Sequence, residues 1–164
     1  MNIVLKNATI LEKNNPFNEE EISLIMKNIL QGINYMHYSK VMHRDIKPHN
    51  IIIDPHNKLL KIIDWGLAEI YQPNTEYSVR VASRYFKGPE LLVDNAFYDY
   101  SLDIWSLGCL FAGLIFKKEP FFHGNDNFDQ LIKVVKIMGS NDLINYLKKY
   151  DLKLNDQYTG LVEK

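Results

Sequence analysis

A helical period of apolar residues marks the first part of the chain. Between residues 19 and 38, apolar side chains return every three or four positions, which places them on one face of a helix. They are Ile22, Ile25, Met26, Ile29, Ile33 and Met36. Asn18 precedes Glu19-Glu20-Glu21, so a capping residue stands three positions before a carboxylate. The pattern predicts a helix that begins after Asn18 and ends near Tyr38.

Two short apolar runs follow, at residues 50–53 and 59–63. The cluster Asp54-Pro55-His56-Asn57 separates them, and such residues favour turns. The two runs are therefore predicted to form a small β-hairpin. Residues 64–90 show no sustained period and contain several Gly and Pro residues, which predicts a long ordered loop.

The second half of the chain shows helical patterns. Residues 100–116 are apolar on almost all sides, which predicts a helix buried in the core. Further helical patterns run over residues 126–138, ended by Gly139, and over residues 141–150. We therefore expect one mainly α-helical unit with a small hairpin, and no linker divides it.

Composition narrows the function classes. Hydrophobic residues make up 46% and charged residues 24%, which is typical of a globular domain. The net charge of −1 gives no field that would attract nucleic acid or a membrane surface, and we expect neither as a partner. The single cysteine, Cys109, excludes an internal disulfide and fits a reducing compartment. Because it lies in an apolar run, we interpret it as a buried residue rather than a reactive thiol.

The candidate chemistry begins in the segment VMHRDIKPHNIIID, residues 41–54. Asp45, Lys47 and Asn50 lie on one loop that leads directly into a predicted strand, so their side chains can converge on one point. Asp45 is able to accept a proton from a substrate hydroxyl, and Lys47 to neutralise a phosphoryl group in transfer. Asn50 is able to ligate a metal ion.

A second acidic residue follows the predicted hairpin. Asp64 comes 14 residues after Asn50, and a hairpin of that length returns the chain to where it began. One carboxylate and one amide that share a hard cation are typical of Mg²⁺ chemistry. For either Asp45 or Asp64 alone, capping a turn or ending a strand is the simpler interpretation. The joint pattern favours a phosphoryl-transfer site.

Four motifs in this order resemble protein kinases. HRDIKPHN is similar to the catalytic loop H-R-D-x-x-x-x-N, and Asp64-Trp65-Gly66 stands where kinases carry D-F-G. Gly88-Pro89-Glu90 stands where they carry A-P-E. Asp103-Ile104-Trp105-Ser106-Leu107-Gly108 resembles the buried helix motif D-x-W-S-x-G. Lys47 is the lysine typical of the Ser/Thr-directed members.

The departures from the general pattern point to one branch of that family. Trp65 in place of Phe, Gly88 in place of Ala, and the run VRVASRYFKGPELLVD together resemble the casein kinase II catalytic (alpha) subunits. The stretches EPFFHGNDNFDQL and YLKKYDL add to that resemblance, which covers about residues 18–155.

The resemblance implies the lower (C-terminal), mainly helical lobe of the protein kinase fold, and it implies roles for the matched residues. Asp45 would be the catalytic base, Lys47 the phosphate contact, and Asn50 with Asp64 the Mg²⁺ ligands. Ile52 and Ile63 would line the lower face of the adenine site. The residues with implied structural roles are His43, Arg44, Trp65, Glu90 and Asp103.

Two of these structural roles have a physical argument beside the resemblance. An acid near the start of an apolar helix is costly to bury without partners, so Asp103 is expected to accept hydrogen bonds from the catalytic-loop backbone. His43 lies two residues before Asp45, which leaves an acid–base dyad open as an alternative. The resemblance favours His43 as a packed, structural residue.

The stretch from Tyr77 to Pro89 carries three cations, Arg80, Arg84 and Lys87, and no acid. A solvated face is the ordinary interpretation of such a run. In kinases, however, this segment receives the substrate just after its phosphoacceptor, and clustered arginine suits the recognition of carboxylates. The resemblance implies acidic protein substrates. It also implies that Ser83 is the small hydroxyl residue that touches the catalytic base and the lysine.

The same resemblance implies that parts of a kinase domain are not in these 164 residues. No G-x-G-x-x-G motif occurs, and the residues before the first long helix are too few for an upper lobe. We expect residues 1–164 to be a partial kinase domain that lacks the upper lobe and the last helices.

Two function classes therefore stay open. One is a Ser/Thr kinase that uses Mg²⁺ with ATP, or with GTP as an alternative. The other is a non-catalytic module that binds acidic peptides or Mg²⁺-nucleotide. The implied location is cytoplasmic, nuclear or both, with the casein kinase II beta subunit as a further candidate partner.

Overall fold

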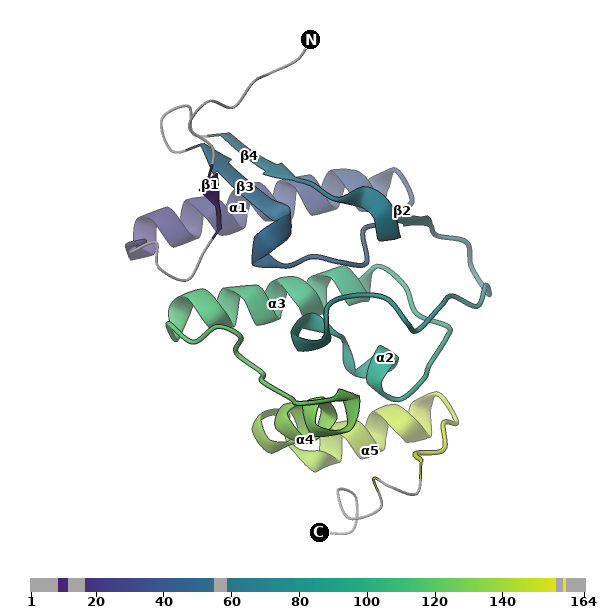
Figure 1. Cartoon of the computed structure of the whole chain (residues 1–164). Coiled ribbons are helices and arrows are strands. Elements are labelled where there is room, and N and C mark those ends of the chain that lie inside the picture. The colour runs from purple at the N-terminus through teal and green to yellow at the C-terminus, as the bar shows by residue number, and fades with distance from the viewer. Residues whose placement is uncertain (1–8, 12–16, 55–58, 156–157, 159–164) are drawn as a thin grey trace.

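The computed structural model describes residues 9–11, 17–54, 59–155 and 158. In chain order the helices and strands are β1 Thr9–Ile10, α1 Glu19–Tyr38, β2 Val41–Met42, β3 Ile51–Asp54, β4 Leu59–Ile62, β5 Glu69–Ile70, α2 Pro89–Leu92, α3 Ser101–Ile115, α4 Asn127–Met138 and α5 Ser140–Lys149. The sheet and α1 lie at one end of the molecule, α3 crosses its middle, and α4 and α5 lie at the other end (Figure 1). The prediction of a mainly α-helical chain is confirmed.

The helix α1 begins and ends where the sequence pattern predicts. The Asn18 side chain accepts a hydrogen bond from the Glu21 backbone N–H at 2.9 Å, and the Glu21 carboxylate accepts one from the Asn18 N–H at 2.8 Å. This reciprocal pair satisfies two N–H groups that have no partner within the helix. Of the six apolar residues at helical spacing, five are buried and Met26 is half-buried. That face packs mainly against β4 and also against α3.

The predicted hairpin is confirmed by antiparallel pairing of β3 with β4. The register runs from Ile51 opposite Ile62 to Asp54 opposite Leu59. The predicted turn residues 55–57 lie outside the described residues. A short strand, β1, adds to the other edge of β3 and gives the strand order β1-β3-β4. Two residues are too few to show a period, so the sequence did not predict β1.

The long loop over residues 64–90 is ordered, as predicted, but it contains short elements that the pattern did not show. Strand β5 pairs with β2, with Val41 opposite Ile70. Two single 3₁₀ turns, Trp65–Leu67 and Arg84–Phe86, and the short helix α2 complete it. An apolar cluster, which we call the loop core, packs against this segment. Its buried members are Met42, Val81, Leu91, Tyr98 and Leu102.

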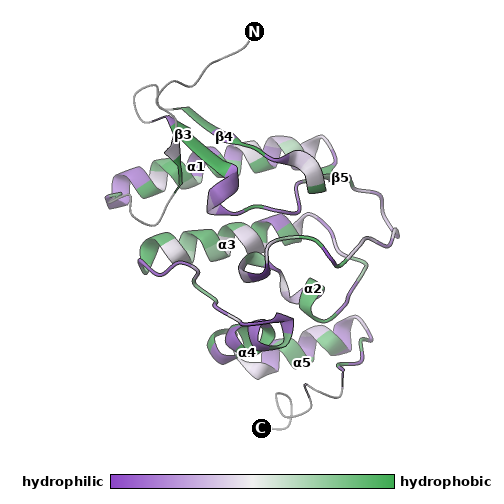
Figure 2. Ribbon diagram, in the orientation of Figure 1, coloured by the Kyte–Doolittle hydropathy of each residue, from purple (hydrophilic) through white to green (hydrophobic). Residues whose placement is uncertain are grey.

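The prediction that the apolar helix is buried on almost all sides is wrong for one face of α3. Ile104, Phe111 and Ile115 are 48%, 42% and 45% exposed, although α3 is mostly apolar (Figure 2). A helix that is apolar on all sides is stable when other groups pack against every face. The pattern itself does not show whether the described residues supply those groups. The opposite face is buried and includes Cys109, so the buried thiol is confirmed. Burial raises the pKa of that thiol to about 12.

The last two helices match their predictions to within one residue. Asp126 caps α4, and its carboxylate accepts a hydrogen bond from the Asp129 N–H at 2.7 Å. Gly139 ends α4 with a φ of 97°, which an L side chain rarely adopts, and α5 follows directly. In the part of the chain that the structure describes, no helix combines the length and apolarity needed to cross a membrane.

Candidate functional site

The loop between β2 and β3 is held from below by one buried carboxylate. Asp103, in the first turn of α3, is fully buried. Its Oδ2 accepts a hydrogen bond from the His43 backbone N–H at 2.9 Å, and its Oδ1 accepts one from the Arg44 N–H at 2.8 Å. The His37 Nε2 lies 2.8 Å from Oδ2. These contacts fix the course of the backbone just before Asp45.

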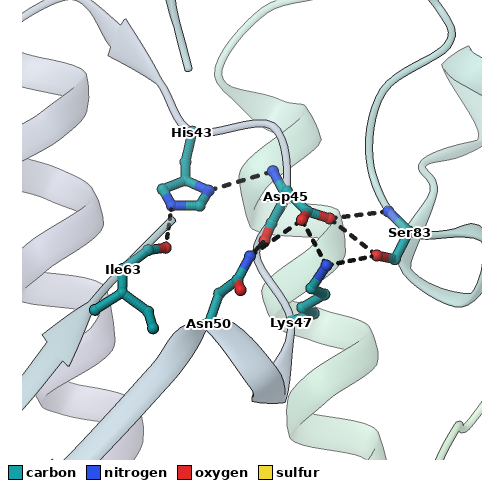
Figure 3. A network of polar contacts seen from close by, with 6 residues as sticks. All are labelled: His43, Asp45, Lys47, Asn50, Ile63 and Ser83. Atoms are coloured by element: carbon teal, nitrogen blue, oxygen red, sulfur yellow. Dashed lines mark hydrogen bonds and ion pairs between the residues drawn. The ribbon is translucent and has the colours of Figure 1, made fainter. Parts of the chain in front are cut away.

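The Asp45 carboxylate is the centre of a polar network (Figure 3). Its Oδ2 accepts from the Lys47 ammonium at 2.6 Å and from the Asn50 amide at 3.1 Å. Its Oδ1 lies 3.0 Å from the Ser83 backbone nitrogen and 3.1 Å from the Ser83 hydroxyl. The Lys47 ammonium also donates to the Ser83 hydroxyl at 2.9 Å. The structure thus gathers Asp45, Lys47, Asn50 and Ser83 around one carboxylate.

The hairpin brings Asp64 beside Asn50. The Ile63 N–H donates to the Asn50 carbonyl at 2.9 Å, and Asp64 is the next residue. Asp64 is exposed and has a φ of 62°, a left-handed conformation that turns the chain at the end of β4. The Asn50 amide nitrogen also donates to the Asp45 carbonyl at 2.8 Å. Both of its described bonds use the nitrogen, so the side-chain oxygen of Asn50 remains for another partner.

This donor set fits a magnesium ion that also binds phosphates. The amide oxygen of Asn50, which has no hydrogen bond to a described residue, and the exposed carboxylate of Asp64 are the hard oxygen ligands that Mg²⁺ prefers. Such a site typically uses one or two protein groups and completes its shell with water and substrate phosphates. Among the described residues, no three His, Cys, Asp or Glu side chains form a cluster that could hold a metal alone.

Both ring nitrogens of His43 contact backbone groups. The Asp45 N–H donates to Nδ1 at 3.3 Å, and Nε2 lies 3.1 Å from the Ile63 carbonyl. An Nε2–H that donates to this carbonyl leaves Nδ1 free to accept, so this pair of contacts selects the neutral Nε2–H tautomer. Burial lowers the pKa of His43, which favours the same neutral form. These contacts favour the structural role over an acid–base dyad with the Asp45 carboxylate.

Trp65 and two isoleucines lie at the hairpin end of the site. The Trp65 ring packs edge-on against His43 with 5.1 Å between centroids, and its Nε1 donates to the Ile62 carbonyl at 3.3 Å. Ile52 and Ile63 are half-buried, on β3 and just after β4. Their partial exposure leaves apolar surface near Asn50.

The stretch from Tyr77 to Pro89, which we call the basic segment, carries two exposed arginines and one buried lysine. Arg80 and Arg84 are exposed, and the Arg84 guanidinium donates to the Asn125 carbonyl at 2.6 Å. Lys87 is only 9% exposed, and its ammonium donates to the Val81 carbonyl at 2.6 Å. Burial, together with the Arg84 charge, lowers the pKa of Lys87. The structure therefore presents Arg80 and Arg84 to solvent and directs Lys87 into the loop.

Glu90 is buried, and one of its carboxylate oxygens accepts no hydrogen bond from the described residues. Its Oε1, like the Nε1 of Trp105, has no hydrogen-bond partner among the described residues. Burial raises the pKa of Glu90 to about 7, so the neutral form is populated near neutral pH. This position agrees with a structural rather than a solvent-exposed role.

Three residues that sequence reasoning missed support the site. His37 contacts Asp103, Asn125 accepts from Arg84, and the Tyr98 hydroxyl accepts from the Arg44 guanidinium at 3.1 Å. Each lies far from its partner in sequence, and no motif spacing marks it. Only the folded chain brings these pairs together.

Comparison with known families gives a match over almost the whole chain. The family model described as protein kinase domain matches residues 2–163. This span contains every residue of the Asp45 network, the hairpin and the basic segment.

Proposed function

Because the chain belongs to the protein kinase family, we propose that it serves a Ser/Thr-directed kinase of the casein kinase II alpha type. The reaction is transfer of the ATP γ-phosphoryl group to Ser or Thr in acidic protein sequences. The observation that carries this proposal is the position of the Lys47 ammonium, 2.6 Å from the Asp45 carboxylate and 2.9 Å from the Ser83 hydroxyl. A base, a cation and a small hydroxyl residue there suit a substrate hydroxyl that attacks a phosphoryl group.

The chain's own residues supply the acceptor half of this chemistry, by which we mean the groups that bind and activate the substrate hydroxyl. Lys47 and Asn50 hold the Asp45 carboxylate in one orientation. In that orientation the carboxylate acts as the general base and accepts the proton of the substrate hydroxyl. Lys47 places a positive charge where charge spreads over the phosphoryl oxygens. Asn50 and Asp64 would hold Mg²⁺, and a bound Mg²⁺ would neutralise charge on the nucleotide phosphates. Ile52 and Ile63 contribute the lower apolar face of the adenine site.

We further propose that residues 1–164 form the lower lobe of a kinase domain. The mainly helical architecture supports this assignment, and so does the absence of a G-x-G-x-x-G motif from the sequence. Protein kinases cover the ATP phosphates with such a loop and pair a strand lysine with a helix glutamate. The alpha-type assignment rests on Trp65, Gly88 and the run VRVASRYFKGPELLVD. A casein kinase II beta subunit as partner and a cytoplasmic or nuclear location belong to the same proposal.

The acceptor specificity is testable with three peptides that differ at one position. The chain, joined in frame to the upper lobe of a casein kinase II alpha subunit, is incubated with labelled ATP and acidic peptides that carry Ser, Thr or Tyr as acceptor. We expect label on the Ser and Thr peptides and little on the Tyr peptide. Equal labelling of the Tyr peptide would contradict the Ser/Thr assignment. Peptide binding without any transfer would support the non-catalytic alternative.

The proposed substrate class is supported by the two exposed arginines, Arg80 and Arg84. We expect Arg80→Ala combined with Arg84→Ala to weaken binding of an acidic peptide far more than binding of its Gln-substituted analogue. Each well-formed charge-assisted contact contributes ~1.5–3 kcal/mol, and exposed contacts contribute less, so the loss should be at most about tenfold per arginine. Fluorescence anisotropy with the two labelled peptides measures it. The preference should also shrink as salt rises.

Two further variants test whether the arginines contact the peptide directly. They control for the loss of a surface charge and for a disturbed loop. Lys27→Ala removes an exposed cation on α1 and should leave both affinities unchanged. Lys87→Ala removes the buried ammonium and its bond to the Val81 carbonyl, so it should disturb the loop and lower binding of both peptides. Equal losses on acidic and neutral peptides for the arginine variant would remove these arginines from substrate selection.

A further inference from the structure

One buried phenol joins the catalytic loop to the basic segment. Tyr98 lies between α2 and α3 and is 5% exposed. Its hydroxyl accepts a hydrogen bond from the Arg44 guanidinium at 3.1 Å and donates one to the Ser78 carbonyl at 2.6 Å. Arg44 and Ser78 are 34 residues apart in the chain, so this single oxygen bridges two segments that the sequence does not connect.

The Arg44 end of this bridge lies next to the proposed base. Arg44 directly precedes Asp45, and Asp103 holds its backbone N–H. The guanidinium also donates to the Leu67 carbonyl at 2.7 Å, and it lies 3.8 Å from the Glu69 carboxylate. Tyr98 thus completes a set of contacts that hold the side chain of the residue beside Asp45.

The Ser78 end opens the basic segment. From Ser78 to Val81 the side chains alternate: Ser78 and Arg80 are exposed, while Val79 and Val81 pack in or against the loop core, which includes the Tyr98 ring. A carbonyl held at Ser78 fixes the position of this short stretch. It therefore fixes the point at which the Arg80 side chain leaves the surface.

We propose that Tyr98 is a positioning residue that couples the catalytic loop to the substrate-selecting arginines. This inference rests on the proposed function for its substrate class. Phenylalanine would fill the same volume in the loop core and would remove both hydrogen bonds. The Arg44 guanidinium and the Ser78 carbonyl would then each lose a partner at a site with little access to water.

The test uses Tyr98→Phe in the 164-residue chain. Hydrogen exchange read by mass spectrometry follows the amides of residues 77–83, with the amides of α1 as the reference for global opening. We expect amide exchange in residues 77–83 to become about tenfold faster. The α1 amides should change only by as much as the variant changes the free energy of global unfolding. Affinity for an acidic peptide should fall about five- to tenfold, and affinity for its Gln-substituted analogue should fall less.

Tyr146→Phe is the matched control. The Tyr146 hydroxyl, on α5, accepts a hydrogen bond from the Asn95 amide at 2.9 Å, so this variant also removes one partly buried phenol oxygen. It should leave both the exchange of residues 77–83 and the peptide affinities at wild-type values. Wild-type exchange in Tyr98→Phe, or equal changes in the two variants, would overturn the proposal. If the wild-type chain does not prefer the acidic peptide, the proposed substrate class fails, and the exchange comparison still decides the role of Tyr98.

Discussion

Replacing Asp45 by asparagine should lower turnover by about 10²–10⁴-fold, the usual contribution of a general base. Asparagine keeps the shape of the side chain and still accepts a hydrogen bond from Lys47, but it cannot take the proton of a substrate hydroxyl. Because Asp45 is proposed to contact the hydroxyl rather than the nucleotide, nucleotide affinity should stay nearly unchanged. Steady-state turnover with an acidic peptide, and calorimetric titration with Mg²⁺-ATP, measure the two quantities in the chain joined to an upper lobe.

The same substitution at an exposed acid controls for the loss of one negative charge. Asp142 is exposed in the first turn of α5, and Asp142→Asn should keep wild-type turnover. Asp45→Asn with more than about a tenth of wild-type activity would show that Asp45 is not the base. A parallel loss of nucleotide affinity would show instead that Asp45 acts on the nucleotide side of the site.

Replacing Asp103 by alanine should lower the free energy of unfolding by about 3–5 kcal/mol, as for other buried charged networks that lose one member. The fully buried carboxylate accepts from the backbone N–H groups of His43 and Arg44. Alanine would leave both N–H groups without an acceptor in a site closed to water, and each such group costs about 1–3 kcal/mol. Urea unfolding of the 164-residue chain, followed by tryptophan fluorescence, measures the change.

The matched control is again an acid without buried partners. Asp142→Ala removes an exposed carboxylate at a helix N-terminus and should cost less than about 1 kcal/mol. If Asp103→Ala cost no more than Asp142→Ala, the two hydrogen bonds would not hold the catalytic loop. Should Asp103→Ala fail to fold at all, Asp103→Asn, which keeps one acceptor oxygen, should fold with an intermediate loss.

The features that the sequence predicts well are set by local chemistry. The reciprocal cap of Asn18 and Glu21 begins α1, and the apolar spacing determines its buried face. The hairpin prediction also placed Asp64 beside Asn50, since antiparallel pairing returns the chain to its starting point. Both predictions depend only on residues close in the sequence.

The features that the sequence did not predict depend on contacts between distant residues. The exposed face of α3 follows from what packs against the helix, and its own apolar pattern carries no information about that cover. Lys87 stands in a basic run, yet its ammonium turns inward to the Val81 carbonyl. Tyr98 reaches both Arg44 and Ser78 because three separate segments meet there. Hydrogen bonds of this kind leave no period or motif in the chain.

The central claim is that the Asp45 network is the acceptor half of a phosphoryl-transfer site that requires a cover over the nucleotide. One assay tests it most directly: transfer of labelled γ-phosphate to an acidic Ser peptide by residues 1–164 alone and joined to an upper lobe, with Asp45→Asn as the blank. Transfer of this kind depends on positioning and charge stabilisation, and orientation alone can lower a barrier by ~7–11 kcal/mol. The joined form should turn over at the ~1–100 s⁻¹ typical of kinases, and the chain alone far below that rate. Turnover near ~1 s⁻¹ by the chain alone, abolished in the blank, would contradict the need for a cover. A joined form no faster than its Asp45→Asn blank would contradict the site itself.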